Sequence, residues 1–179
     1  MPPKPRGPPK QRPEVDETPE IEPREQAEWI KMVELEMKKK LVGGFKVTRK
    51  DVTTIWEGKV QNRAPNFAAV DKLHKSMLII GVRRLQSEHH MVGTSCADDI
   101  SGMLHALNQT RKSVTGLNAK LEFSEVPSDW MDEKDIKIQL EAGQHRFLAL
   151  DKLYENDEEE RWWILKLFEQ PLSAAALMH

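Results

Sequence analysis

Apolar and polar residues alternate along one stretch of the chain, residues 136–140, where two isoleucines and a leucine are separated by a lysine and a glutamine. An alternation with a period of two predicts a half-buried β-strand. After Gly143 the period changes, and the apolar residues of 147–153 recur at helical spacing. The stretch 136–153 therefore predicts a strand, a tight turn at the glycine and a helix.

The first strong helical pattern covers residues 25–42. An apolar residue recurs there at every fourth position, the early turns are acidic, and three consecutive lysines lie near the C-terminal end, as the helix dipole favours. The pair Gly43-Gly44 follows directly. Because glycine commonly ends a helix, we expect this helix to stop at that pair.

Two longer helices and one short helix are predicted further along. Residues 67–80 have a continuous apolar face and are followed by a glycine. Ser95 and Asp98 are expected to cap another helix, which carries Ile100, Met103, Leu104 and Leu107. Thr48 and Asp51 have the spacing of a capping box, with Asp in the place of Glu, and are expected to open a short helix.

Three further strands are expected, over residues 82–85, 117–123 and 161–168. The predicted fold class is α+β, a small mixed sheet with surrounding helices and an N-terminal helical extension.

Composition divides the chain into three parts. Residues 1–24 hold eight of the eleven prolines and almost no apolar residue, which predicts a disordered leader. Residues 25–61 are the helical extension, and 62–179 the main domain, with an insertion at about 88–127. The chain ends on an apolar helical pattern without a cap, so we expect a fragment of a longer protein.

The insertion is rich in residue types that bind metals. No two of them have a recognised zinc spacing, so no metal site is predicted. The insertion is expected to be a lid or a surface for a protein partner, anchored to the core by Trp130. The metal-binding residue types are His89, His90, Cys96, Asp98, Asp99 and His105.

Composition excludes several classes of function. A chain of 179 residues with a formal charge of −2 has no overall positive field for nucleic acid. The single cysteine, Cys96, excludes an internal disulfide framework. No apolar run reaches the length of a membrane span, and no signal peptide is recognised, so an intracellular protein of cytoplasm or nucleus without a membrane partner is expected.

The turn at Gly143 has the chemistry of an anion site. Free backbone N–H groups and the positive end of the dipole meet at a helix N-terminus, where glycine lets a ligand approach closely. Arg146 adds a planar charged group suited to phosphate oxygens. Gln144 and His145 supply further hydrogen bonds.

This region resembles the ParB/sulfiredoxin superfamily, in which a G-x-x-R-x-x-A box holds the phosphates of a nucleotide. The resemblance runs from about residue 64 to the end of the chain. It implies a mixed sheet with helices, a nucleoside di- or triphosphate as ligand, and Mg²⁺ arriving with the phosphates. The motifs are Gly143-Gln144-His145-Arg146-x-x-Ala149, then Val70-x-x-Leu73-x-x-Ser76-Met77-x-x-x-Gly81-Val82, and Arg161-Trp162-Trp163-Ile164-Leu165-Lys166-Leu167.

The resemblance also suggests further site residues. Arg63, Arg83 and Arg84 are candidates for a second phosphate contact, because the first motif lies across the pocket from the box in the family. Glu141 is the nearest carboxylate for metal or base work, and His145 is the other candidate base. In sulfiredoxins a cysteine stands where this chain has Gln144, which argues against sulfiredoxin activity.

Four functions stay open at this point. The domain binds and senses a nucleotide, or it hydrolyses the nucleotide or transfers a phosphoryl group with Glu141 or His145 as base. The same cluster could bind the backbone phosphates of a nucleic acid. The balanced charge of the chain does not favour this function. Finally, the domain could be inert and recruit a protein partner through the insertion or the Pro-rich tail.

Overall fold

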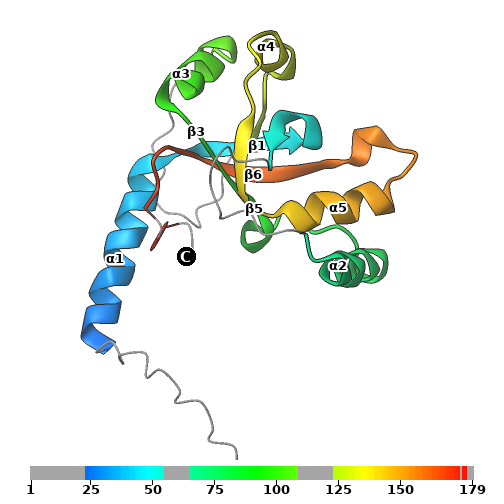
Figure 1. The fold of residues 1–179 in the computed structure, drawn as a ribbon, viewed down its shortest axis with the longest axis horizontal. Helices are drawn as coiled ribbons and strands as arrows, with labels where there is room; N and C mark the ends of the chain where they lie inside the picture. Colours follow the sequence, from blue (N-terminus) through cyan, green and yellow to red (C-terminus); the bar gives the residue numbers. More distant parts are fainter. Residues whose placement is uncertain (1–22, 55–64, 109–122, 174, 177–179) are drawn as a thin grey trace, which may run out of the picture.

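The computed structural model of the protein describes residues 23–54, 65–108, 123–173 and 175–176. Within them, six strands form one mixed sheet in the order β2-β5-β3-β6-β1-β4 (Figure 1). Neighbours β2 and β5, β3 and β6, and β1 and β4 run parallel, and the other two pairs run antiparallel. The strands are β1 (Leu41–Thr48), β2 (Val52–Thr53), β3 (Met91–Ser95), β4 (Phe123–Glu125), β5 (Ile138–Ala142) and β6 (Trp162–Glu169).

Five α-helices surround the sheet in the described residues, so the expected α+β class with a small mixed sheet is confirmed. Helices α2 and α5 lie side by side, α3 and α4 lie together at the opposite side of the view, and α1 projects from the sheet (Figure 1). The helices are α1 (Pro23–Lys40), α2 (Phe67–Ile80), α3 (Ala97–Ala106), α4 (Ser128–Glu133) and α5 (Gln144–Leu153). Short 3₁₀ turns are η1 (Arg49–Asp51), η2 (Ser87–His89) and η3 (Glu158–Glu160).

The main core lies between the sheet and α5. Leu140 of β5 and Leu165 of β6 are fully or almost fully buried, and they belong to one apolar cluster with Phe147 and Leu150 of α5. Burying such side chains contributes about 1.5–3 kcal/mol each. This cluster fixes α5, and with it the turn at Gly143, against the centre of the sheet.

A second, smaller core holds α1 to the sheet. Val33 and Met37, one helical turn apart, are buried together with Leu41 and Phe168. The spacing predicted this apolar stripe. Trp29, one turn earlier, is 42% exposed, so the stripe reaches the core only in the second half of the helix.

The expected end of the first helix is wrong. Helix α1 stops at Lys40, and Gly43-Gly44 lies inside β1, paired with β6 on one side and β4 on the other. An inner strand has hydrogen-bond partners on both edges, and this tertiary pairing outweighs the local tendency of glycine to end a helix. Part of the expected helical extension is therefore a strand inside the sheet.

The strand expected over residues 82–85 is also wrong. The chain turns there, and the strand that enters the sheet is β3, between β5 and β6, inside the stretch expected to be an insertion. Arg84 is buried and hydrogen-bonds to the carboxylate and the carbonyl of Glu160, each at 3.1 Å. The Arg84 side chain is held by these contacts from a turn of the backbone, whereas Met91 of β3 is fully buried within the sheet.

Of the two predicted caps, the Thr48–Asp51 box is present and the Ser95 cap is wrong. Asp51 accepts hydrogen bonds from the Thr48 N–H at 2.7 Å and the Thr48 hydroxyl at 2.8 Å, but the box opens only the 3₁₀ turn η1 before β2. Helix α3 is capped by Cys96, whose sulfur accepts from the N–H of Asp99 at 3.4 Å, one residue later than the expected cap Ser95.

The stretch expected to be an insertion supplies β3, α3 and β4 and is part of the main fold, and Trp130 packs against the core as expected. The ring of Trp130 in α4 is partly buried and contacts Gly102 of α3, where an added Cβ would lie 2.7 Å from the ring. Most of the strand expected over 117–123 lies outside the described residues, and Phe123 begins β4.

Candidate anion-binding site

The predicted strand, glycine turn and helix are present. Strand β5 ends at Ala142, Gly143 has φ = 111°, and α5 begins at Gln144. A Cβ at position 143 would lie 2.4 Å from Cγ of Met91. Both the positive φ and this close approach require glycine, so the turn packs directly onto β3.

The N-terminus of α5 carries no side-chain cap. Gly143 occupies the N-cap position and has no side chain to accept a hydrogen bond. The first backbone bond of this turn runs from the N–H of Arg146 to the carbonyl of Gly143 at 2.8 Å. The N–H groups of Gln144 and His145 precede it and face the space beyond the helix end, together with the positive end of the dipole.

The three polar side chains of the box point in different directions. Gln144 lines a small hollow of about 70 Å³ that it shares with Arg49 of η1. His145 contacts α2, where its Nε2 accepts a hydrogen bond from the N–H of Asn66 at 2.9 Å. Arg146 lies on the side of His90. The positive charge of Arg146 lowers the pKa of the His90 imidazole.

Arg146 is a partly buried cation. Burial lowers the pKa of its guanidinium, because the charged form is poorly solvated there. No acidic side chain in the described part of the chain pairs with it. A desolvated cation without a carboxylate partner is typical of an anion-binding group.

His90 immediately precedes β3 and is 9% exposed. Among the described residues neither Nδ1 nor Nε2 makes a hydrogen bond of normal geometry, although the Leu85 backbone lies close enough to favour the charged ring, and the ring meets Phe123 edge to face, with centroids 5.4 Å apart. Burial lowers the pKa of His90, and the charge of Lys166 lowers it further, against opposing effects of the Leu85 backbone and Glu88. Two unsatisfied nitrogens are costly and call for a ligand.

Lys166 is a further basic residue. It lies on β6 in register with Val92 of β3, and burial lowers its pKa. Lys166 stands between Leu165 and Leu167, which belong to the core cluster beside α5, so its side chain faces the opposite side of the sheet. Its charge lowers the pKa of His90, but the structure does not bring Lys166 together with Arg146.

Glu141 belongs to a different environment. Its Oε1 accepts a hydrogen bond from the Thr94 hydroxyl at 2.6 Å, and the amide of Gln170 donates to that hydroxyl oxygen at 2.9 Å. Side chains alternate along a strand, so Glu141 faces away from Leu140, which packs beside α5. The structure therefore does not bring Glu141 together with Arg146.

The arginines expected to form a second phosphate contact are not brought together either. Arg63 lies outside the described residues. Arg83 is exposed. Arg84 is buried in a structural contact, with its guanidinium 4.1 Å from the centroid of Trp162.

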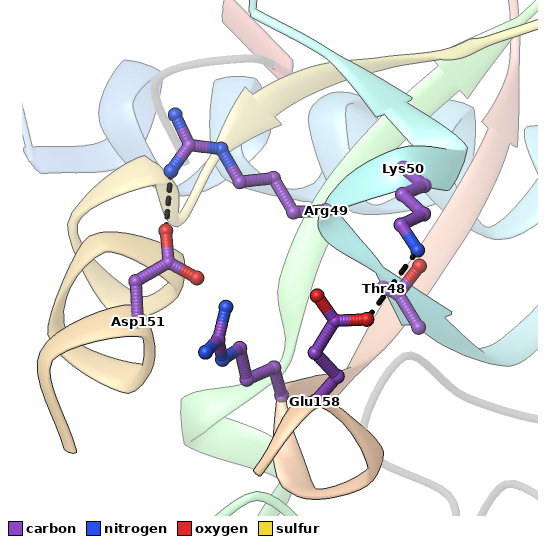
Figure 2. A pocket seen from close by; sticks show the side chains of 6 residues that line it. Thr48, Arg49, Lys50, Asp151 and Glu158 are labelled. Carbon is purple, nitrogen blue, oxygen red and sulfur yellow. Dashed lines mark hydrogen bonds and ion pairs between the residues drawn. The ribbon is translucent and has the colours of Figure 1, made fainter. Parts of the chain in front are cut away.

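A pocket with a volume of about 420 Å³ lies beside α5 (Figure 2). Arg49 forms an ion pair with Asp151, and Lys50 lies 3.6 Å from Glu158. Arg161 completes the wall and donates to the carbonyl of Tyr154 at 2.7 Å. Arg49 also lines the hollow beside Gln144, so the two spaces adjoin.

Sequence reasoning missed His90, Lys166 and the pocket residues Arg49 and Asp151. His90 was noticed only as a metal-binding residue type, and Lys166 only as part of a buried strand. The proximity of His90 to Arg146 depends on strand order, because β3 lies between β5 and β6. No local sequence signal encodes that neighbourhood.

The fold and site define a mixed α+β domain with an uncapped helix N-terminus flanked by basic side chains. Residues 44–179 match the family described as the protein of unknown function (DUF3723) N-terminal domain, and the chain belongs to that family. No curated protein and no solved structure matches the chain.

Two further searches concern the described residues alone. Among them, no helix combines the length and apolar character needed to cross a membrane. The same residues contain no group of three or more His, Cys, Asp or Glu side chains placed to hold a metal ion.

Proposed function

We propose that this domain binds the phosphate groups of a nucleoside di- or triphosphate at the N-terminus of α5. The observation that carries the proposal is His90, whose two buried nitrogens lack hydrogen-bond partners among the described residues and which lies within the electrostatic reach of the desolvated Arg146. The resemblance of Gly143 to Ala149 to the phosphate box of the ParB/sulfiredoxin superfamily supports the same ligand and a ParB-like arrangement.

In this proposal, two backbone N–H groups, Arg146 and His90 each contact the phosphate. The N–H groups of Gln144 and His145 donate to its oxygens, and the dipole of α5 adds attraction. Arg146 offers two parallel N–H donors, which suit a phosphate better than a point charge does. His90 becomes a donor from both nitrogens once the anion stabilises its charged form.

Magnesium in this proposal is held mainly by the ligand. Mg²⁺ keeps several waters and binds through phosphates with one or two carboxylates. Glu141, the expected carboxylate, is engaged with Thr94, and the described residues offer no three-residue metal group. Phosphate oxygens and water therefore supply its coordination.

Binding, rather than hydrolysis or phosphoryl transfer, is the activity that we propose. A general base must reach the attacking group. Of the two candidates, Glu141 is hydrogen-bonded to Thr94 and His145 accepts from Asn66. Both side chains already take part in structural hydrogen bonds. In this proposal the domain therefore senses or holds the nucleotide.

Thermal unfolding with ligand tests this proposal. A ligand that binds only the folded state at a hundredfold excess over its Kd stabilises it by about 2.7 kcal/mol. Pyrophosphate and nucleoside di- and triphosphates with Mg²⁺ should raise the Tm of the wild type. Arg146→Ala and His90→Phe should abolish the shift, while the exposed control Arg83→Ala should keep it.

His90→Phe is the more informative substitution. It retains an aromatic ring against Phe123 and removes only the two nitrogens. A folded His90→Phe variant with an unchanged Tm shift would contradict the role of His90. A wild type that responds to none of these ligands would overturn the proposed function.

A second candidate function is protein binding, favoured by an apolar surface at the end of α2. Leu78, Ile79 and Ile80 are 62%, 81% and 53% exposed, and Leu85 nearby is 65% exposed. Neighbouring large apolar residues at such exposure mark interaction sites. Sedimentation of the chain with and without Ile79→Lys tests the first partner to consider, a second copy; association lost in the variant supports this function, and a monomer at all concentrations argues against that partner.

A further inference from the structure

We infer that the pocket beside α5 holds the nucleoside part of the ligand whose phosphates lie at the N-terminus of the helix. This inference rests on the proposed function, because it assigns the remainder of the same ligand. It adds a second set of contact residues, centred on Arg49 and Asp151, that decide which phosphate compound is bound.

The path between the two places follows one flank of α5. Gln144 lies next to the turn, and it shares the small hollow with Leu148 and Arg49. Asp151, which lines the large pocket, follows on the same helix flank, since residues three and four apart are neighbours. From Gln144 to Asp151 the helix rises about 10 Å. A compact phosphate cannot span that length, whereas a nucleotide can.

The pocket suits a nucleoside in size and chemistry. Its volume of about 420 Å³ lies in the range of small-molecule sites, about 300–1,000 Å³. Asp151 uses Oδ2 for the pair with Arg49, so Oδ1 remains to accept from a ribose hydroxyl or a base amine. The guanidinium of Arg49 provides a planar surface on which a base can stack.

The charges fix the direction in which the ligand lies. In the pocket, Arg49 pairs with Asp151, Lys50 with Glu158, and Arg161 donates to the carbonyls of Tyr154 and Glu155. These cations are already compensated, and the two carboxylates repel phosphate. Among the described residues, Arg146 and His90 have no such partners, so the phosphates belong at the helix end and the uncharged nucleoside in the pocket.

Exposed side chains on one side of the pocket can move at little energetic cost. The side chains of Lys50 and Glu158 are 80% and 74% exposed and 3.6 Å apart, a geometry in which an ion pair contributes little. The side chain of Arg49, between the hollow and the pocket, is 61% exposed. A ligand can separate the Lys50–Glu158 ion pair and shift the Arg49 side chain without disturbing the core.

Isothermal titration of the whole chain with two probes tests the inference. Pyrophosphate reports on the phosphate site alone, and a panel of nucleoside diphosphates with Mg²⁺ reports on both sites. Asp151→Asn and Arg49→Ala should weaken the preferred nucleoside diphosphate by about tenfold or more, because a charge-assisted hydrogen bond is lost. The same variants should bind pyrophosphate as tightly as the wild type.

The neighbouring ion pair provides matched controls. Lys152 on α5 pairs with Asp71 on α2, so it resembles the Arg49–Asp151 pair but does not line the pocket. Lys152→Gln and Asp71→Asn should leave both affinities unchanged. A Tm close to that of the wild type shows that each variant is folded.

The possible failures are distinguishable. Equal loss of pyrophosphate and nucleotide affinity in Asp151→Asn, or no loss of either, overturns the assignment of the pocket while the phosphate site stands. Wild-type affinity for nucleoside diphosphates no higher than for pyrophosphate also overturns it. Absence of pyrophosphate and nucleotide binding overturns the proposed function itself.

Discussion

The imidazole of His145, in the first turn of α5, accepts a hydrogen bond at 2.9 Å from the backbone N–H of Asn66, the N-cap of α2. Asn66 in turn accepts from the N–H of Ala69 at 3.2 Å through its own side chain. The N-terminal ends of the two helices are therefore tied together. The accepting Nε2 must be unprotonated, so the neutral ring carries its proton on Nδ1.

Removing this link should destabilise the fold without affecting phosphate binding. We expect His145→Ala to lower the free energy of unfolding by about 1 kcal/mol, the usual worth of a neutral hydrogen bond. Urea unfolding measures the loss, and the exposed control His105→Ala should change stability by less than about 0.5 kcal/mol. Loss of the ligand-induced Tm shift in a folded His145→Ala variant would instead point to a direct role of His145 in the site.

Gly143 should tolerate no side chain. Alanine there meets a backbone cost at φ = 111° and overlaps Met91, whose Cγ would lie 2.4 Å away. We expect Gly143→Ala to cost about 1–3 kcal/mol for the backbone and a further 1–3 kcal/mol for the overlap. Gly81→Ala is the control, because φ is +78° but no atom lies within 4 Å. A smaller loss at 143 than at 81 would show that Met91 moves freely.

Asp51 should be important for stability, although it lies outside the candidate site. Its buried carboxylate accepts from the N–H and hydroxyl of Thr48 and, at 2.8 Å, from the hydroxyl of Ser128. Asp51→Ala leaves these donors unpaired, and we expect a loss of about 2–4 kcal/mol in urea unfolding. Ser128→Ala should cost about 1 kcal/mol. The exposed Glu125→Gln, which breaks only the pair with Lys46, should have little effect.

Stability should depend on pH through His90. Its pKa is lowered in the folded state by burial and then by Lys166, with a smaller effect of Arg146, so the unfolded chain binds the proton more readily. The stabilisation is therefore fully present above about pH 6.5, the ordinary histidine pKa, and is lost as pH falls below it. Urea unfolding from pH 5 to 8 measures this.

His90→Phe should flatten that pH dependence, and pyrophosphate should reduce it in the wild type by stabilising the charged ring. The variant removes the titrating group and keeps the aromatic contact with Phe123. An unchanged slope between pH 5 and 7 in His90→Phe would assign the dependence to other groups.

Several elements followed from sequence because their causes are local. The change of period around Gly143 predicted β5, the turn and α5, and the apolar faces of α2 and α3 predicted those helices closely. Periodicity reports which side of an element is buried, and glycine reports where the backbone needs a positive φ. Both are properties of a few neighbouring residues.

The errors came where distant strands compete with local tendency. Gly43-Gly44 joined an inner strand, and β3 formed in a stretch that was expected to be an insertion. Arg84, which the sequence suggested as a phosphate contact, stacks on Trp162 instead. In each case the deciding partner is far away in the chain.

The α+β class, the glycine turn and the presence of Arg146 in the first turn of α5 follow from the order of residues alone. The surroundings of that arginine depend on how the strands pack. His90 lies near Arg146 because β3 pairs with β5 and β6 in a particular order and register, whereas Glu141 and Lys166 face the other side of the sheet because strand side chains alternate. Local sequence fixes a backbone conformation, whereas the electrostatics of a site depend on groups brought together by packing.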